Sequence, residues 1–215
     1  MRSFPGVCHP PVALVPPIFT RSQFRLDSVP SLRPSVSFVL ITGGARSGKS
    51  RFAVELAQGF HRRILYVATG KISDPEMRQR ILRHRRQRPP HWQTIEPPCD
   101  PAGVLLHLDH RVGGVLMDCL TLYLSDLLMQ GDSDAMIQRK LRRLLSAIRR
   151  VSVPVIMVTN EVGSGLVPEH PLGRRFRDLA GMANQQAAQV ADCVVWMVSG
   201  IPVALKSEAP SFKER

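Results

Sequence analysis

The sequence has few cysteines and no long apolar run, and each shortage excludes a class of protein. Its 215 residues include four cysteines, Cys8, Cys99, Cys119 and Cys193, and no two of them form a CxxC pair. Neither a zinc ribbon nor a disulfide framework is indicated, so we expect a reducing, cytoplasmic setting. An ordinary transmembrane helix needs about 18 or more consecutive apolar residues. The sequence contains no such run, and we expect no membrane span.

Acidic residues are also scarce. Asp and Glu number 17 against 29 Lys and Arg, which gives a formal net charge of +12. Such an excess favours polyanionic partners: nucleic acid, an anionic membrane surface or small molecules that carry phosphate. Residues 61–90 concentrate the charge, with nine basic side chains and two acidic ones. A solvated helical face would give the same run of charge.

The chain divides by composition into a tail, a folded region and a short end. Residues 1–36 contain seven prolines and one acidic residue and have neither helical nor strand periodicity. We interpret them as a flexible Pro-rich tail. Their acid-poor composition is similar to that of a transit peptide, although the prolines oppose an amphipathic helix, and a start codon assigned too far upstream is an equal alternative. Residues 37–206 form the predicted domain, and residues 207–215 are a C-terminal tail.

From residue 37 onward, short apolar runs alternate with helical segments. Nearly continuous apolar runs are typical of parallel strands that are buried on both faces. The predicted strands are 38–42, 64–69, 114–118, 153–159 and 193–198, and the predicted helices are about 49–59, 75–87, 101–109, 119–130, 135–150 and 173–191. This alternation predicts an α/β three-layer sandwich with a mostly parallel central sheet, which binds ligands at the carboxyl ends of its strands.

Local signals support three of these helices. Ser73-Asp74-Pro75-Glu76 offers a Ser or Asp cap with proline in the first turn, and Asp100-Pro101 repeats the arrangement. Apolar residues recur at helical spacing between 136 and 148. We expect that stripe to face the core and the basic residues beside it to face solvent.

The strongest motif is a phosphate-binding loop. It reads Gly43-Gly44-Ala45-Arg46-Ser47-Gly48-Lys49-Ser50 and matches GxxxxGK[ST] between a predicted strand and a predicted helix. Glycines in such a loop let consecutive N–H groups point at phosphate oxygens, and the helix adds its positive end. We expect Lys49 to reach the β- and γ-phosphates and the Ser50 hydroxyl to ligate Mg²⁺, as in P-loop NTPases.

A phosphate loop needs a second group on the side of the metal. The predicted strand at 114–118 ends in Asp118, and a carboxylate in that place holds Mg²⁺ directly or through water. A simple helix cap is the alternative role for this residue. The sequence therefore predicts a nucleotide-binding protein with Ser50 and Asp118 on the metal.

Further blocks follow the phosphate loop in a fixed order. They are Ile41–Arg51; Arg80-Ile81 with His84, Arg88-Pro89, Trp92 and Glu96; Asp118-Cys119-Leu120-Thr121; Thr159-Asn160-Glu161-Val162-Gly163; and Phe176-Arg177-Asp178 with Gly181 and Asn184-Gln185. Together the blocks resemble the bifunctional adenosylcobinamide kinase / adenosylcobinamide-phosphate guanylyltransferase family of cobalamin biosynthesis. The resemblance runs from about Phe38 to Lys206 and leaves out the Pro-rich tail.

The resemblance implies two reactions at one nucleotide site. In the first, ATP or GTP with Mg²⁺ phosphorylates the aminopropanol hydroxyl of adenosylcobinamide. In the second, GTP guanylylates an enzyme histidine and releases pyrophosphate, and the cobinamide phosphate takes the GMP to give adenosylcobinamide-GDP. The partners implied are adenosylcobinamide, its phosphate and the nucleotides, in a homo-oligomer without nucleic acid.

The guanylylated histidine of the family falls on His84. A neutral imidazole is a good nucleophile near pH 7, and the phosphoramidate that it forms can pass its GMP onward. The neighbouring arginines would clamp the triphosphate and keep the imidazole unprotonated, provided that they lie close in space. They are Arg83, Arg85, Arg86 and Arg88. His91, beside Trp92, is the alternative nucleophile, although we expect it to be a packing residue.

The resemblance also assigns the residues that contact the nucleotide. They are Gly43, Gly44, Ala45, Arg46, Ser47, Gly48, Lys49, Ser50, Ala68, Thr69, Gly70, Arg85, Arg86, Gln87, Arg88, Glu96 and Asp118. Glu96 could accept two hydrogen bonds from guanine, or it could be an ordinary surface residue. The expected catalytic residues are His84, Lys49 and Glu161, because Glu161 follows a strand where a base could take the substrate's proton; a structural carboxylate is its alternative.

Some choices stay open on the sequence alone. A polar group at residues 174–185 would face either substrate phosphate or a neighbouring subunit. A single-function small-molecule P-loop kinase is the first alternative function, and a nucleic-acid-associated P-loop ATPase is the second. The sequence has no aromatic platform near the basic stretch beyond Trp92, which disfavours the second.

Overall fold

The computed structural model describes residues 37–60, 62–71 and 74–207. The predicted tail at 1–36 lies outside these ranges, as does all of the predicted C-terminal tail except Ser207. The described residues belong to one unit, Leu32–Arg215. Among them, no helix combines the length and the apolarity that crossing a bilayer requires.

A seven-stranded sheet forms the middle of this unit. Its strands, in the order in which they pair, are β3 (Gln93–Ile95), β2 (Ile64–Ala68), β4 (Gly114–Asp118), β5 (Val155–Val158), β1 (Phe38–Gly43), β6 (Cys193–Val198) and β7 (Ile201–Ser207). All neighbouring strands are parallel except β6 and β7. The five strands predicted from apolar runs are confirmed, and so is the mostly parallel sheet.

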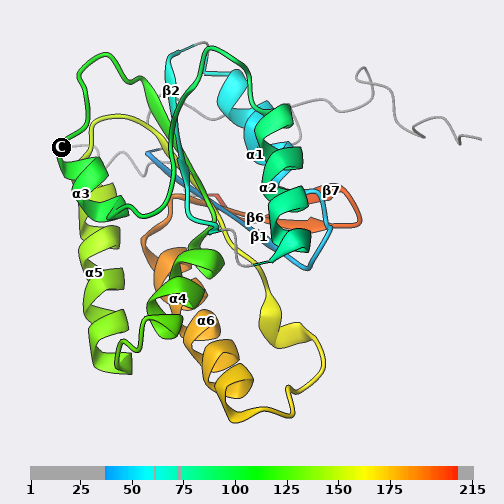
Figure 1. The fold of residues 1–215 in the computed structure, drawn as a ribbon. Coiled ribbons are helices and arrows are strands. Elements are labelled where there is room, and N and C mark those ends of the chain that lie inside the picture. The colour runs from blue at the N-terminus through cyan, green and yellow to red at the C-terminus, as the bar shows by residue number, and fades with distance from the viewer. Residues whose placement is uncertain (1–36, 61, 72–73, 208–215) are drawn as a thin grey trace, which may run out of the picture. The chain divides into compact units, whose positions relative to one another are not determined.

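The helices form a layer on each face of the sheet (Figure 1). Their bounds are α1 (Lys49–Gln58), α2 (Pro75–Gln87), α3 (Pro101–Leu106), α4 (Leu120–Met129), α5 (Asp134–Arg150) and α6 (Pro171–Val190), with a 3₁₀ turn η2 at Val162–Ser164. Helix α1 packs on β1, β4 and β5 with α2 beside it, and α3 to α6 lie on the opposite face. The predicted three-layer α/β sandwich is therefore confirmed.

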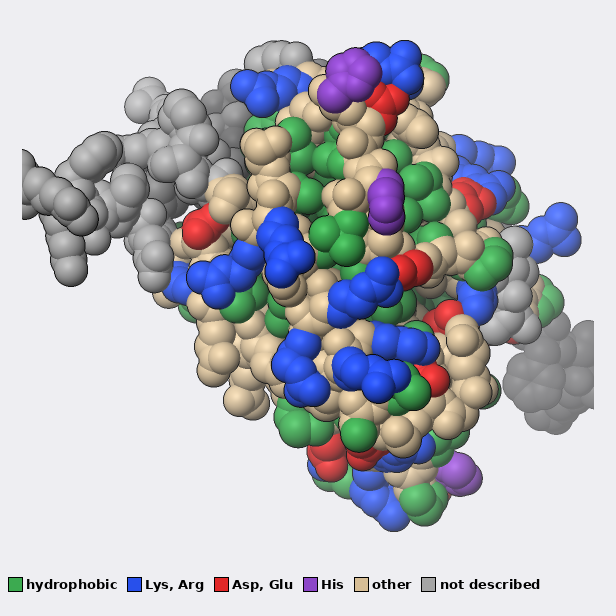
Figure 2. Space-filling model, turned by 90° about the vertical axis from the view of Figure 1, so that its left-hand side faces the viewer, with side chains coloured by type: hydrophobic (Ala, Val, Ile, Leu, Met, Phe, Trp, Pro, Cys, Tyr) green, Lys and Arg blue, Asp and Glu red, His purple; other side chains and the backbone are tan. Residues whose placement is uncertain are grey.

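Helix α5 contributes six buried residues to the layer that α3 to α6 form. Its buried residues are Ile137, Leu141, Leu144, Leu145, Ala147 and Ile148, and Ser133 caps it by accepting a hydrogen bond from the Met136 N–H. The basic side chains lie off this stripe, and Lys and Arg gather on the face that α3 and α5 present (Figure 2). The apolar spacing thus predicted both the helix and its buried side.

Some helix boundaries differ from the prediction for local reasons. Helix α3 ends at Leu106 rather than 109, because Asp109 instead closes a turn with the backbone and guanidinium of Arg111. Asp100 occupies the N-cap position of α3, but its carboxylate makes no cap and pairs with Arg143 at 2.7 Å. Helix α6 begins at Pro171, two residues early, since His170 caps it.

Strand order brings three loops together at one edge of the sheet. β5 lies between β1 and β4, and Val158 is in register with both Ile41 and Asp118. Because these strands are parallel, the phosphate loop after β1, Asp118 at the end of β4 and Glu161 after β5 share the carboxyl edge. That edge is where an α/β sheet binds ligands.

Candidate active site

The phosphate loop connects β1 to α1 through two glycines with unusual backbone angles. Gly43 has φ 143°, and a Cβ there would lie 2.4 Å from the carbonyl oxygen of Met197. Gly48 has φ 95° at the N-cap of α1. Only glycine adopts such angles without strain. The loop therefore presents the N-terminus of α1 and its free N–H groups to the carboxyl edge, as an anion site requires.

Lys49 is held across the loop. Its ammonium donates hydrogen bonds to the carbonyl oxygen of Gly44 at 2.5 Å and to Oδ1 of Asn160 at 3.1 Å. Partial burial lowers the pKa of Lys49, an effect that the nearby Asp118 and Glu161 carboxylates oppose. The side chain thus bridges the β1 and β5 loops, and a phosphate can replace the Gly44 carbonyl as its acceptor.

Asp118 is the residue at which the site converges. Its Oδ2 accepts a hydrogen bond from the Tyr66 hydroxyl at 2.7 Å and lies 3.3 Å from Nδ1 of His84. The Ser50 side chain also interacts with this carboxylate and helps to lower its pKa. Burial alone would raise the pKa of Asp118, but the hydrogen bonds from His84, Tyr66 and Ser50 outweigh it and leave the pKa lowered. It caps no helix, because the N-cap of α4 is Cys119.

This contact fixes the tautomer of His84. An ionised carboxylate can only accept, so the His84 Nδ1 must carry the proton that Asp118 receives. In the neutral imidazole, Nε2 is then left with its lone pair, as a nucleophile requires. Burial, followed by the charge of Asp118, raises the pKa of Tyr66 well above its ordinary value, so the phenol also stays a donor.

Helix α2 carries His84 in its last turn but is weakly attached to the rest of the domain. None of its residues is buried, although Asp74 caps it by accepting from the Met77 N–H at 2.8 Å. Arg85 makes a two-pronged ion pair with Glu96, with its Nε 2.8 Å from Oε1. The His84–Asp118 and Arg85–Glu96 contacts therefore determine where α2 lies over the site.

Glu96, the residue expected to contact guanine, is committed to arginines in this structure. Hydrogen bonding from Arg85 is the main cause that lowers the pKa of Glu96, although burial opposes it. Arg88 lies 3.6 Å away. A guanine that reached this carboxylate would take the place of the Arg85 guanidinium, because both present paired N–H donors.

A small pocket lies where these groups meet. Its lining consists of Tyr66, Ala68, Gly70, Met77, Arg80, Ile81, His84, Arg88, Glu96, Asp118 and Leu122. The Arg88 guanidinium stacks on the Tyr66 ring at 3.7 Å, and its buried Nε has no hydrogen-bond partner among the described residues. A buried unpaired donor is costly unless a ligand satisfies it. Arg88 therefore lines the pocket as a cation whose Nε has no partner among the described residues.

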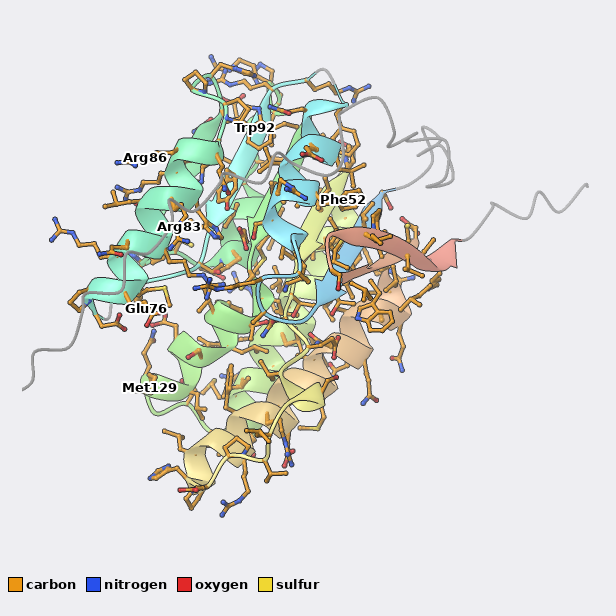
Figure 3. The ribbon with its side chains drawn as sticks, turned by 90° about the vertical axis from the view of Figure 1, so that its right-hand side faces the viewer. Phe52, Glu76, Arg83, Arg86, Trp92 and Met129 are labelled. Atoms are coloured by element: carbon orange, nitrogen blue, oxygen red, sulfur yellow. The ribbon has the colours of Figure 1, made fainter. Side chains whose placement is uncertain are left out.

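Not all of the predicted residues come together here. Arg83 and Arg86 are exposed on α2 (Figure 3), and so is Gln87. Of the predicted arginine clamp, only Arg88 lines the pocket, with Arg85 paired to its wall residue Glu96. His91 is exposed and lies outside the lining, so its expected role in packing is wrong.

Backbone contacts place the end of β2 beside Asp118. Thr69 accepts from the Cys119 N–H at 2.6 Å, donates to the Cys119 carbonyl at 2.7 Å and bonds the Asp118 carbonyl through its own N–H. Ala68 and Gly70 line the pocket directly. A Cβ on Gly70 would lie 3.0 Å from Leu122, so a larger residue would narrow this wall.

Glu161 lies beside the phosphate loop. Its N–H donates to the Gly43 carbonyl, and its Oε1 accepts from Thr42 at 2.5 Å and from Asn184 at 3.0 Å. The polar residues of α6 do not form one cluster: Arg174 bonds carbonyls of the preceding loop, Asn184 is buried and Gln185 is exposed. The idea that all of them face one ligand or subunit is therefore wrong.

Sequence reasoning missed three residues of the site. Tyr66 lies inside an apolar strand, where the pattern shows only a buried segment, although a buried phenol needs a partner. Arg80 precedes Ile81 in one of the ordered sequence blocks, but the sequence alone assigns it no role. Asn160 precedes Glu161 and bonds Lys49. A polar residue at the carboxyl end of a predicted strand is the signal that could have identified the last of these.

The donor set fits a magnesium ion better than a transition metal. No group of three or more His, Cys, Asp or Glu residues gathers as a metal cluster in the described part of the chain. The Ser50 hydroxyl and the Asp118 carboxylate are adjacent hard oxygen donors. Mg²⁺ binds to one or two such ligands and completes its shell with phosphate oxygens and water.

Comparison with known proteins covers nearly the whole described unit. A family model described as cobinamide kinase / cobinamide phosphate guanyltransferase matches residues 39–205. The bifunctional adenosylcobalamin biosynthesis protein CobU of Escherichia coli K12 is 44% identical over 181 residues, 78% of this chain and 99% of that protein. The protein of the same name from Salmonella typhimurium LT2 is 41% identical, again with 78% of this chain and 99% of that protein covered. CobP of Pseudomonas aeruginosa PAO1, which has the same bifunctional description, is 40% identical, with 79% of this chain and 97% of that protein covered. Among solved structures, the RadB recombinase aligns with 74% of this chain and 73% of its own at 17% identity and a TM-score of 0.44.

Proposed function

Because this chain belongs to the cobinamide kinase / cobinamide phosphate guanyltransferase family, we propose that it phosphorylates adenosylcobinamide and then attaches GMP to the product through a covalent histidine intermediate. The product is adenosylcobinamide-GDP. ATP or GTP serves the first step, and GTP serves the second.

One observation carries this proposal: Asp118 interacts with Ser50 of the phosphate loop and also lies 3.3 Å from Nδ1 of His84. A plain kinase needs the first contact and has no use for the second. A histidine whose Nδ1 is occupied, and which lines the same pocket as Asp118, can attack phosphorus through Nε2. The shared carboxylate supports His84 as the nucleophile of the second step.

In the kinase step, the substrate hydroxyl attacks the γ-phosphorus and the bond to the β–γ bridging oxygen breaks. Glu161 takes the hydroxyl proton, which its place beside Gly43 supports. Lys49 leaves the Gly44 carbonyl for the phosphates and stabilises the charge on the transferred group. Glu161 and Lys49 therefore act at opposite ends of the same displacement.

In the guanylyl step, the His84 Nε2 attacks the α-phosphorus of GTP and pyrophosphate leaves. A phosphate oxygen of cobinamide phosphate then attacks the same phosphorus, the P–N bond breaks and His84 is restored. Asp118 holds the imidazole in the nucleophilic tautomer and balances its positive charge during attack. The buried Arg88 Nε supplies a donor for the triphosphate.

We propose that Ser50 and Asp118 hold Mg²⁺ with the nucleotide phosphates. When bound, the ion neutralises phosphate charge in both transfers. The hydrogen bond from the Tyr66 hydroxyl holds the Asp118 carboxylate in the orientation proposed to bind Mg²⁺.

The setting of the reaction also belongs to the proposal. The described cysteines Cys99, Cys119 and Cys193 are all free, which supports a cytoplasmic enzyme. A corrinoid is too large for the small pocket at His84, so we propose that a homo-oligomer completes the acceptor site. Glu96 would select guanine once Arg85 has moved off it.

The direct test is a coupled assay with adenosylcobinamide, Mg²⁺ and GTP, with products identified by mass spectrometry. We expect cobinamide phosphate first and the GDP adduct later. Folded protein that yields neither product would overturn the proposal.

A second experiment separates this function from that of a single-function kinase. The protein is incubated with GTP labelled at the α-phosphate and then denatured. We expect acid-labile, base-stable label on the wild type and on Arg83→Ala, an exposed control one residue away, and no label on His84→Ala. Kinase activity without any label in the wild type would leave only the simpler function.

A further inference from the structure

A chain of hydrogen bonds behind the active site leads from α4 to Glu161. The Asn160 N–H donates to the Thr121 hydroxyl at 2.8 Å, the Thr121 and Thr159 hydroxyls lie 3.1 Å apart, and Thr159 donates to Oδ1 of Asn184 at 2.7 Å. Asn184 then donates to Oε1 of Glu161 at 3.0 Å. Thr121, Thr159 and Asn184 are all buried, so water does not compete for these bonds.

The direction of every bond in this chain is determined. Each hydroxyl has a single proton, and Thr159 gives its own to Asn184, so Thr121 must donate to Thr159. Asn184 accepts on Oδ1, and its amide nitrogen faces two groups that can only accept, the Asn160 carbonyl and the Glu161 carboxylate. All the donors therefore point towards Glu161.

We propose that Asn184 is the positioning residue for the proton acceptor of the kinase step. It holds Oε1 of Glu161 together with Thr42 and leaves Oε2 to take the proton of the substrate hydroxyl. This inference rests on the proposed kinase function and on Glu161 as its base. Asn184 acts through Glu161 and touches neither nucleotide nor acceptor.

The same hydrogen bonds connect Lys49, at the end of the phosphate loop, to the loop that follows β5. Asn160 bonds Lys49 through its side chain and Asn184 through its carbonyl. Thr121 lies in the first turn of α4, which begins two residues after Asp118, the last residue of β4. A rigid, fully bonded Asn184 thus keeps Glu161 in register with the lysine that binds phosphate, which near-attack geometry requires.

Few charged side chains of the described residues surround Glu161. The cation facing it is Lys49 of α1, which also feels Asp118 of β4 and Arg80 of α2. On α6, no ionisable residue follows Asp178, which pairs with Arg177. A second carboxylate at position 184 would lie against Glu161 and disfavour its charged form.

The test compares Asn184→Asp with Gln185→Asp, which adds the same charge at an exposed position one residue along α6. The measurements are the pH profile of cobinamide phosphorylation, the KM for the nucleotide and the labelling of His84 by GTP. For Asn184→Asp we expect the acid limb of kcat to move up by about one pH unit, so that kcat falls by up to about tenfold on that limb and recovers as the pH rises above it. We expect the nucleotide KM and His84 labelling to stay within about twofold of wild type, and Gln185→Asp to match wild type throughout.

A second variant covers the case in which Asn184→Asp does not fold. Thr42→Val removes the other donor to Oε1 and keeps the shape of the side chain. We expect it to reduce kcat for phosphorylation with His84 labelling unchanged. Equal loss of both half-reactions in either folded variant, or an unchanged pH profile in Asn184→Asp, would overturn the inference.

Two controls separate this failure from failure of the proposed function. Wild-type protein that does not phosphorylate adenosylcobinamide refutes the kinase function itself, and Glu161→Gln with wild-type kcat refutes the base. An active wild type and an inactive Glu161→Gln, together with an unaffected Asn184→Asp, refute the positioning role alone.

Discussion

At the residue scale, Asp118 joins the functions of the site because two donors from different elements share its Oδ2. Tyr66 reaches it from β2 and His84 from α2. The parallel register places Ala68 opposite Asp118, so the phenol two residues earlier points along the strand towards the carboxylate. Both donors therefore stabilise the negative charge of the Asp118 carboxylate.

Tyr66→Phe removes one of these donors and keeps the ring on which Arg88 stacks. A hydrogen bond to a charged group contributes about 1.5–3 kcal/mol to stability, and we expect the variant to lose that amount at pH 7 in urea unfolding. We also expect slower labelling of His84, since Asp118 is held less firmly. Unchanged stability and labelling would show that the phenol has no influence on Asp118.

The pH dependence of this loss has a definite sign. The pKa of Asp118 is lowered in the folded state, so its contribution to stability is present above the ordinary Asp pKa and is lost as pH falls through the folded value. Tyr66→Phe makes the lowering smaller. The difference between variant and wild type should therefore be full at pH 7 and shrink as pH falls below about 4. A difference that grew on acidification would contradict this explanation.

Motifs at the residue scale were predictable where chemistry alone requires the residue type. The phosphate loop and Asp118 follow directly from a strand, a glycine turn and a carboxylate. His84 came from resemblance, because an imidazole among arginines is usually a surface residue. Tyr66 and Asn184 could not be predicted, since a single polar group in an apolar segment shows its partner only when distant elements are in contact.

At the scale of elements, α2 is unusual because it holds a proposed catalytic residue and buries nothing. A 13-residue helix is marginal in water without tertiary packing. Its cap and its few side-chain contacts therefore decide how far it is formed. The arginine-rich helix α2 is therefore held over the proposed nucleotide site by few contacts.

Asp74→Ala should loosen α2 by about 1 kcal/mol, because it removes the cap on the Met77 N–H. We expect faster hydrogen exchange across α2 and slower labelling of His84, with little change in phosphorylation. Asp74→Asn keeps an acceptor and is the matched control. Wild-type exchange in Asp74→Ala would mean that other contacts fix the helix.

Helix α5 behaves in the opposite way, since packing determines it. Leu141 is fully buried, and Leu141→Ala should lower the free energy of unfolding by about 2–5 kcal/mol in urea denaturation. Arg142→Ala, at the exposed neighbouring position, should stay within about 0.5 kcal/mol of wild type. Similar losses in both variants would show that the apolar stripe does not set the stability of this layer.

Two strands could not be predicted for reasons that belong to this scale. β3 has only three residues, Gln93–Ile95, and none is buried. β7 is an exposed edge strand that contains Pro202. β3 is too short to show the apolar run that parallel burial imposes on the inner five strands, and a proline within a run such as that of β7 disfavours a strand because it is tolerated only at an edge.

At the scale of the whole chain, the relatives align with most of their own length but with 78–79% of this protein. The family match begins at residue 39, and Ser37 already bonds Asp192 at the start of β6. The segment before it has no counterpart in that match. We therefore expect the proposed chemistry not to need this segment.

Removal of Met1–Ser31, the first of the two units of the chain, should leave both half-reactions within about twofold of the full chain. The measurement is the same coupled assay on both proteins at equal concentration. A loss of either activity from a folded truncated protein would assign the segment a part in catalysis.

The proposed function depends most on His84 as the point of covalent attachment. The direct measurement is intact-protein mass spectrometry after incubation with GTP and Mg²⁺, followed by peptide mapping under basic conditions that preserve a phosphoramidate. We predict one GMP per chain, located on His84 and released when cobinamide phosphate is added. An adduct on another residue such as His91, or none in protein that still makes cobinamide phosphate, would contradict the account.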